Sequence, residues 1–232
     1  PFSDVFNRDI TFFKAITRKY IENTLLLNKR KDYWLIDGIQ TYLMIEYVNT
    51  YYPEMKLLGK VSKIWGIRSF NLAKLNFNDK YPLVYQFSAR QFLDQALNTR
   101  VDSLSNFNRK IANKYKAGLG LQYLKGYIGD SIVKQSFKEY YDSHLLKISS
   151  SLDFNKIISS KTDKNLEWFF GDYIKTNKKI DYTIKKIEIQ NDSLKIDIKN
   201  KRNITAPIAL YGVKNKKVKF KKWFTGIDSI KT

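Results

Sequence analysis

The spacing of apolar residues changes once along this chain, and that change constrains the fold more than any other feature. Up to about residue 175, apolar side chains recur at three- or four-residue steps, the period of an amphipathic helix. After Thr176 the period falls to two, as in strands with one buried face. The pattern predicts an α+β fold, with a helical domain over residues 1–175 and a small β-sheet domain over residues 176–232.

The first 175 residues are expected to be all-α. The clearest helices are predicted at residues 7–28 and 32–52, the second of which is stopped by Pro53. The helical period also returns between Tyr115 and His144, with a break at Gly129. Further helical pieces are expected at residues 56–65, 87–97, 103–114, 152–160 and 165–176, with a loop over residues 77–82.

Four strands joined by polar turns are expected at residues 180–190, 193–200, 204–213 and 217–224. Lys185 and Lys186 interrupt the alternation, as a β-bulge does. Lysines at the outer positions have an ordinary explanation, because charged strand edges prevent edge-to-edge aggregation. Phe220, Trp223 and Phe224 occupy positions expected to face a core instead of alternating with the lysines, which argues against a surface that stacks nucleic-acid bases.

Composition removes several classes of site. The 232 residues include no Cys, which excludes disulfides, thiolate nucleophiles and Cys-ligated zinc, and a single His, His144, which is expected at the surface. A site that needs two imidazoles cannot be assembled from this chain alone. The apolar runs are shorter than the roughly 20 residues that cross a bilayer. Because the chain begins at Pro1 without an initiator Met, we expect a segment of a longer polypeptide, so the missing signal peptide leaves the compartment open.

The formal net charge is +20, and it is unevenly distributed. Residues 175–232 hold 16 Lys or Arg and 5 Asp or Glu, a net +11 in a quarter of the chain. Lysines spread over every segment more often form a solvated surface than a phosphate-binding footprint, so no specific nucleic acid is expected as a partner. Glu46 and Glu139 are isolated helical carboxylates and are likewise expected in solvent.

Residues 32–43, DYWLIDGIQTYL, contain a Trp-Leu pair, an acidic residue followed by Gly, and a later Tyr. This stretch resembles the segment of the zinc aminopeptidases related to membrane alanyl aminopeptidase, the gluzincins, in which Trp-Leu-x-Glu-Gly-x-x-x-Tyr brings in the third zinc ligand. Asp37 falls on that Glu. In the family, 18 residues separate the Glu from an H-E-x-x-H motif. The same gap, counted back from Asp37, ends at Arg18 and replaces the motif by Lys14-Ala15-Ile16-Thr17-Arg18.

The resemblance extends over most of the chain apart from residues 54–110. Tyr115 falls on the family tyrosine that stabilises the oxyanion and Gly118 on a family glycine, but Ala117 replaces the family lysine. Residues 151–174 are similar to the helices that follow in the family. The resemblance therefore implies the helical half of a thermolysin-like catalytic domain, followed by a small β-sandwich-like domain that would be incomplete at Thr232.

The matched positions do not carry the zinc chemistry of the family. Such a site needs two neutral imidazoles one helical turn apart, a carboxylate, and a general base after the first imidazole. Lys14 and Arg18 stand at the imidazole positions and Asp37 at the carboxylate, while Ala15 removes the base. Arg cannot lose its proton in a protein, so it cannot ligate a cation. No metal and no cofactor are expected, and zinc would return only if this register is wrong.

A buried Asp37 would then need a positive partner, and Arg18, Lys14 or both could supply it. The ordinary alternative is that Lys14 and Arg18 are two exposed cations at i and i+4. Without a metal there is no oxyanion for Tyr115 to stabilise, so Tyr115 is interpreted as a structural or binding-groove residue.

The resemblance implies an aminopeptidase-like domain that has lost its zinc site and serves as a scaffold or binding domain. Its expected partner is the rest of its own longer polypeptide, or another protein or peptide, and a location in the cell envelope or elsewhere outside the cytoplasm is favoured. One alternative is an active zinc aminopeptidase fragment whose motif precedes Pro1. The other is a basic protein that binds nucleic acid or anionic surfaces, with affinity that falls steeply with salt.

Overall fold

The structure, a computed structural model, describes residues 2–64, 71–191, 193–202, 204–215, 217–227 and 230–231. It has the α+β composition that the sequence predicts, with helices followed by small antiparallel sheets. The longer helices are α1 (Asp4–Thr24), α2 (Tyr33–Tyr51), α4 (Lys80–Arg90), α5 (Asn113–Ile128), α6 (Asp130–His144) and α7 (Ser151–Ser160). The short helical elements are η1 (Gly59–Lys63), α3 (Asn71–Lys74), η2 (Phe77–Asp79), η3 (Val101–Ser103), η4 (Asn108–Ala112) and η5 (Trp168–Tyr173). The strands are β1 (Leu25–Leu27), β2 (Lys147–Ser149), β3 (Tyr182–Gln190), β4 (Ser193–Asn200), β5 (Ile208–Lys214), β6 (Lys217–Phe224) and β7 (Ile230–Lys231).

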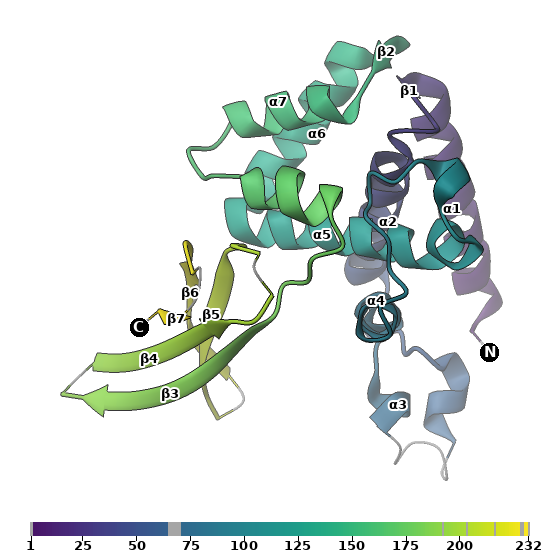
Figure 1. Cartoon of the computed structure of the whole chain (residues 1–232). Helices are drawn as coiled ribbons and strands as arrows, with labels where there is room; N and C mark the ends of the chain where they lie inside the picture. The colour runs from purple at the N-terminus through teal and green to yellow at the C-terminus, as the bar shows by residue number, and fades with distance from the viewer. Residues whose placement is uncertain are drawn as a thin grey trace.

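The helix α2 is the centre of the helical part and is buried along most of its length. It packs between α1 and α5, while α6 packs against α5 and α7 packs against α6 (Figure 1). The approach of α2 to α5 requires Gly118, because a Cβ atom there would lie 2.4 Å from Thr41 Cγ2. The predicted break between α5 and α6 is confirmed at Gly129, whose φ of 109° lies in the region that favours glycine.

The expectation of an all-α first part is wrong at a short parallel strand pair and at an isolated antiparallel bridge between Lys56 and Asn76. Leu25–Leu27 leaves the helical conformation and pairs in parallel with Lys147–Ser149, so α1 ends at Thr24 and does not continue to residue 28. Leu25 and Leu27 enter the core while Leu26 is exposed, the alternation of a strand. Three consecutive leucines carry no local signal for this pairing, because the partner segment lies far away in the sequence.

The expected loop over residues 77–82 is also wrong. Residues 77–79 form η2, and α4 starts at Lys80, so Pro82 lies in the first turn of a helix, where its missing N–H has no intrahelical partner to lose. The start of η2 is supported by Asp79, whose carboxylate accepts from the Asn76 backbone N–H at 2.7 Å. The helix α4 then ends at Arg90 and does not reach residue 97.

The other weak helical predictions have mixed outcomes. The piece at residues 56–65 contains only the short η1, and residue 65 lies outside the described residues. The piece at 103–114 contains η4 and the start of α5. Helical structure is present in both of the last two predicted pieces, as α7 within 151–160 and as η5 within 168–173.

The stranded region forms two small antiparallel sheets. One has the order β3-β4-β7 and the other is the β5-β6 hairpin. The predicted bulge is confirmed, because the β3–β4 register shifts between Ile184 and Lys186. Ile198, Ile208 and Ile227 form a small core that the two sheets share. Phe220 was expected in a core, but it is 47% exposed and that expectation is wrong.

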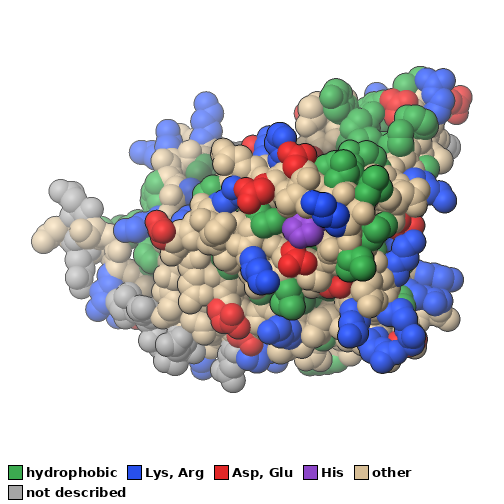
Figure 2. Space-filling model, turned by 90° about the horizontal axis from the view of Figure 1, so that it is seen from above, with side chains coloured by type: hydrophobic (Ala, Val, Ile, Leu, Met, Phe, Trp, Pro, Cys, Tyr) green, Lys and Arg blue, Asp and Glu red, His purple; other side chains and the backbone are tan. Residues whose placement is uncertain are grey.

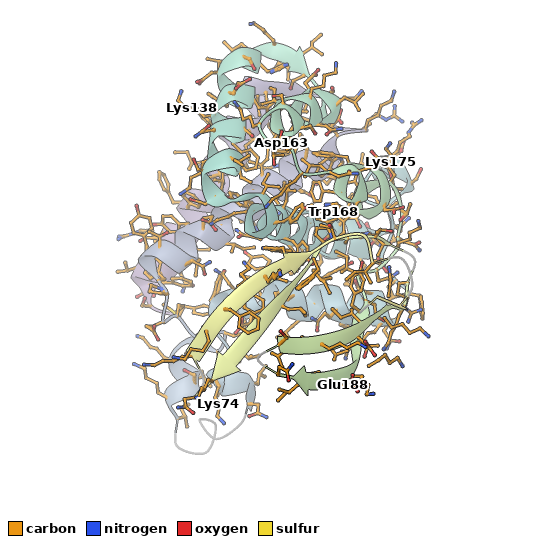
Figure 3. The ribbon with its side chains drawn as sticks, turned by 90° about the vertical axis from the view of Figure 1, so that its left-hand side faces the viewer. Lys74, Lys138, Asp163, Trp168, Lys175 and Glu188 are labelled. Atoms are coloured by element: carbon orange, nitrogen blue, oxygen red, sulfur yellow. The ribbon has the colours of Figure 1, made fainter. Side chains whose placement is uncertain are left out.

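An aromatic cluster joins the helical part to the β5-β6 hairpin. Trp223 of β6 makes edge contacts with Tyr123 and Tyr127 of α5, at ring-centroid distances of 5.5 and 5.3 Å. Both tyrosines also contact Trp168, which Figure 3 shows between the helices and the strands. Ile204 belongs to the helical core as well, so this core extends into the segment before β5.

In the part of the chain that is described, no helix has the length and apolar character needed to span a membrane.

Candidate functional site

The five residues singled out from the sequence come from three helices and line two connected cavities. Lys14, Ala15 and Arg18 of α1 and Asp37 of α2 line a cavity of about 750 Å³, called the outer cavity here. Tyr115 of α5 lines a smaller cavity of about 170 Å³, called the inner cavity, together with Lys14. Both cavities share the lining residues Lys14, Gln40, Lys110 and Lys114.

The pairing predicted for Asp37 is confirmed for Arg18. The two residues meet across the α1–α2 interface, where Arg18 Nη1 donates to Asp37 Oδ1, and Arg18 Nε donates to Glu22 one turn further along α1. Asp37 is 2% exposed, so the carboxylate is buried within α2 and its partner reaches it from a neighbouring helix.

Lys14, the other predicted partner of Asp37, does not pair with it. It is exposed, and its ammonium makes no ion pair with a carboxylate of the described residues. Its backbone carbonyl accepts from Gln40 Nε2 at 2.8 Å, a bond that ties α1 to α2. For Lys14 the structure therefore agrees with the simpler interpretation of an exposed helical cation, whereas Arg18 is engaged by two carboxylates.

The electrostatics of the pair are dominated by burial. Burial raises the pKa of the Asp37 carboxyl, while the positive charges of Lys114 and Arg18 act in the opposite direction and only partly offset it. Burial lowers the pKa of the Arg18 guanidinium, but the charges of Asp37 and Glu22 outweigh this and the net shift is upward. Arg18 is therefore held in its charged form, as expected for a guanidinium between two carboxylates.

The residues present at this place do not fit a zinc ion. An ammonium, a charged guanidinium and one carboxylate offer a single anionic ligand, and that carboxylate is already bound by Arg18. Ala15 has no group that could take a proton from a water molecule. Within the described ranges there is also no group of three His, Cys, Asp or Glu side chains placed to hold a metal.

Tyr115 is half-buried and packs edge-on against Tyr81 of α4, with ring centroids 4.8 Å apart. Burial raises the pKa of its phenol, which keeps it neutral at ordinary pH. Both interpretations made from the sequence, a structural role and a place in a binding groove, agree with this position.

Sequence reasoning missed most of the positive charge at the cavities. Arg109 and Lys110 of η4 and Lys114 of α5 line the outer cavity, and Lys80 of α4 lines the inner one. Lys114 Nζ donates to Gln40 Oε1 at 3.1 Å. Basic residues at helical spacing just before Tyr115 are visible in the sequence as a signal, but Lys80 is not, because it lies far from them in the chain.

Among the basic residues that line the cavities, Lys80 has the most strongly lowered pKa. Its ammonium lies 3.3 Å from the centroid of the Phe77 ring, and it makes no ion pair among the described residues. Burial, together with the nearby charge of Lys14, lowers the pKa of Lys80 to about 7.

Three other expectations concern residues outside these cavities. Glu46 was expected in solvent, but it accepts from Lys125 Nζ at 2.7 Å and from Gln122 Nε2 at 2.9 Å, so that expectation is wrong. Glu139 forms an ion pair with Lys161 at 2.5 Å. His144 ends α6 on a face where acidic and basic side chains are mixed (Figure 2). Its Nδ1 contacts the Tyr140 carbonyl and the Ser143 hydroxyl.

Comparison with protein-family models and with curated protein sequences finds no match to this chain.

Proposed function

We propose that this chain is a non-catalytic relative of the zinc aminopeptidases and acts as a binding or scaffold domain within a longer polypeptide. One observation carries the proposal. The two positions that the family motif assigns to metal ligands, Arg18 and Asp37, meet across two adjacent helices. This contact supports the register of the resemblance, because residues that once shared a metal ion must lie side by side.

The loss of catalysis follows from the side chains. Hydrolysis by this family requires a metal that activates water and a base that takes its proton. Arg18 supplies a fixed positive charge where the metal would bind, and Asp37 is neutralised by it. Ala15 cannot act as the base. An ion pair that occupies the place of the metal keeps the helices together without any bound ion.

A binding role is supported by the outer cavity beside the Arg18–Asp37 ion pair. The outer cavity of about 750 Å³ has the size of known ligand sites, and its lining includes the aromatic side chain of Tyr33 and the methyl group of Ala15. The partner in this proposal is another part of the same polypeptide or a separate molecule that enters the cavity.

Restoration of the metal site tests the family relationship. The variant Lys14→His, Ala15→Glu, Arg18→His and Asp37→Glu should bind one equivalent of Zn²⁺, and its Co²⁺ form should show the absorption of a four-coordinate site. The same variant without Ala15→Glu should still bind Zn²⁺ but should not hydrolyse aminoacyl reporter substrates, because the general base is absent.

A matched control tests whether Zn²⁺ binding depends on the positions of the two imidazoles or only on their presence. It carries the other three changes, but Lys19→His replaces Arg18→His, which turns the second imidazole about 100° around α1. Equal Zn²⁺ binding by the control and the restored variant would contradict the proposal. Chelator-sensitive aminopeptidase activity of the unmodified chain would also overturn it.

A further inference from the structure

The lining of the two cavities is unusually rich in positive charge. The basic lining residues are Lys14, Arg18, Lys80, Arg109, Lys110 and Lys114. Asp37 is the single carboxylate among the lining residues of either cavity, and Arg18 neutralises it. The concave part of this surface is therefore far more basic than the helices around it.

We propose that the connected cavities bind a compact anion that carries two or more phosphoryl groups. This names the ligand for the binding role proposed above and rests on that role, although it does not depend on the family relationship. The four lysines supply the charge for the ligand, and Arg18 with Asp37 forms one wall.

The lysines at the cavities have no carboxylate of the described residues at ion-pair distance, although the charge of Asp37 acts on Lys114. Lys14, Lys80, Lys110 and Lys114 form no ion pair with any carboxylate of the described residues. Elsewhere on the helices, some lysines are paired, as Lys125 is with Glu46, and others, such as Lys19 and Lys156, form no ion pair among the described residues. What distinguishes Lys14, Lys80, Lys110 and Lys114 is that all four line the same small cavity, where their like charges repel one another.

Holding these like charges together is costly without a ligand. Lys80 and Lys114 are half-buried, and burial lowers the pKa of both, to about 7 for Lys80. The charge of Asp37 acts against this shift at Lys114, and the neighbouring charge of Lys14 lowers both pKa values further. An anion placed between these ammonium groups would replace lost hydration and remove the mutual repulsion.

The chemistry of the cations favours phosphoryl groups over carboxylates. Planar carboxylates are best recognised by the forked guanidinium of Arg, but the fork of Arg18 is already occupied by Asp37 and Glu22. Arg109 also lines the outer cavity, where its guanidinium donates to Asn106 Oδ1. The other free groups are four ammonium ions, which act as point charges and suit the several oxygens of a phosphoryl group. The inner cavity of about 170 Å³ has room for one such group, and the outer cavity has room for the rest of the ligand.

Calorimetric titration of the unmodified chain with inorganic pyrophosphate and tripolyphosphate, at about 150 mM salt, tests the proposal. We expect one ligand per chain and weaker binding of orthophosphate and acetate. The double variant Lys110→Gln and Lys114→Gln should weaken binding by about tenfold or more, because both cavities lose two charges. Thermal unfolding without ligand shows whether the double variant is folded. Lys14→Gln gives a second variant, in which an exposed cavity lysine is replaced and the half-buried Lys80 and Lys114 are kept.

The control is the variant Lys217→Gln and Lys219→Gln, which removes two exposed lysines of β6 that make no ion pair among the described residues. It has the same net charge as the cavity variant and should keep the affinity of the unmodified chain. An equal loss of affinity in both double variants would overturn the proposal, as would binding of several ligands per chain. Tighter binding of a single-stranded oligonucleotide or of anionic vesicles, unaffected by the cavity substitutions, would also overturn it in favour of a basic surface.

This experiment and the restored-metal experiment can fail separately. Pyrophosphate bound through Lys110 and Lys114, together with a restored variant that binds no Zn²⁺, would leave the ligand inference standing and remove the family relationship. A restored variant that binds Zn²⁺, together with an unmodified chain that does not bind pyrophosphate, would give the opposite conclusion.

Discussion

Arg18 donates to the Asp37 carboxylate from the neighbouring helix, and the pair is unevenly buried. The Asp37 side chain is 3% exposed, whereas that of Arg18 is 23% exposed and also bonds to Glu22. Loss of Arg18 leaves a buried carboxylate, while loss of Asp37 leaves a cation that keeps another partner and some water. The two halves of the ion pair should therefore contribute unequally to stability.

Arg18→Met should lower the free energy of unfolding by about 3 to 5 kcal/mol, because an unpaired charge remains buried. Asp37→Asn should cost less, about 1 to 3 kcal/mol, because Arg18 keeps Glu22. Chemical denaturation of both variants at neutral pH measures the difference.

The double variant Arg18→Met with Asp37→Leu is the control for this interpretation. It should recover much of the loss of Arg18→Met, because removal of both partners of a buried pair is often nearly neutral. Additive losses in the double variant would show that the residues act independently and that the ion pair is not the cause.

The defect of Arg18→Met should shrink as the pH falls from about 7 to about 4.5. Burial already raises the pKa of Asp37, and removal of a cation that lowers it raises it further. A carboxyl with a raised pKa in the folded state contributes stability at low pH, and this contribution is lost as the pH rises through that pKa. Urea unfolding of both proteins across this range checks the sign, and a defect that grows on acidification would contradict it.

Lys80→Met should flatten the dependence of stability on pH between about 7 and 10. The pKa of Lys80 is lowered to about 7 in the folded chain, so the unfolded chain binds more protons in this range and stability rises with pH. One full proton would give about 1.4 kcal/mol per pH unit, and the partial exposure of Lys80 reduces this slope. The comparison of urea unfolding at pH values of about 7 and 9 isolates Lys80, because the other lysines are common to both proteins.

Gly118→Ala should destabilise the helical part by about 1 to 3 kcal/mol, since the new Cβ atom would meet Thr41 Cγ2 at 2.4 Å and separate α2 from α5. Gly126→Ala on the same helix is the matched control. Its Cβ atom would meet Trp223 at 3.5 Å, an ordinary contact, and Ala favours the helix by up to about 1 kcal/mol. Thermal unfolding should therefore move in opposite directions for the two variants.

Trp223→Ala should cost about 2 to 3 kcal/mol and should loosen the β5-β6 hairpin, because the indole packs on Tyr123 and Tyr127. Phe220→Ala, on the same strand but 47% exposed, should change stability by less than about 1 kcal/mol. Hydrogen exchange of the hairpin amides should rise only in the first variant. Equal effects would mean that Trp223 does not anchor the hairpin.

Local pattern was sufficient for the features that depend on neighbours in sequence. The change of period after Thr176 predicted helices and then strands, and Lys185 and Lys186 marked the bulge in β3. Gly129 marked the break between α5 and α6. These features follow from backbone conformation and from the burial of one face, and both are written within a few residues.

The sequence also pointed to Arg18 and Asp37 as a pair, because a motif with a known spacing relates two neighbouring helices. It did not reveal the β1–β2 pairing or the place of Lys80 beside Lys110 and Lys114. Contacts of this kind join segments that are far apart in the chain, and they depend on how α4 and α5 pack against α1 and α2. Packing alone therefore decides that four lysines, each ordinary in its own segment, line one small cavity and form no ion pair with a carboxylate of the described residues.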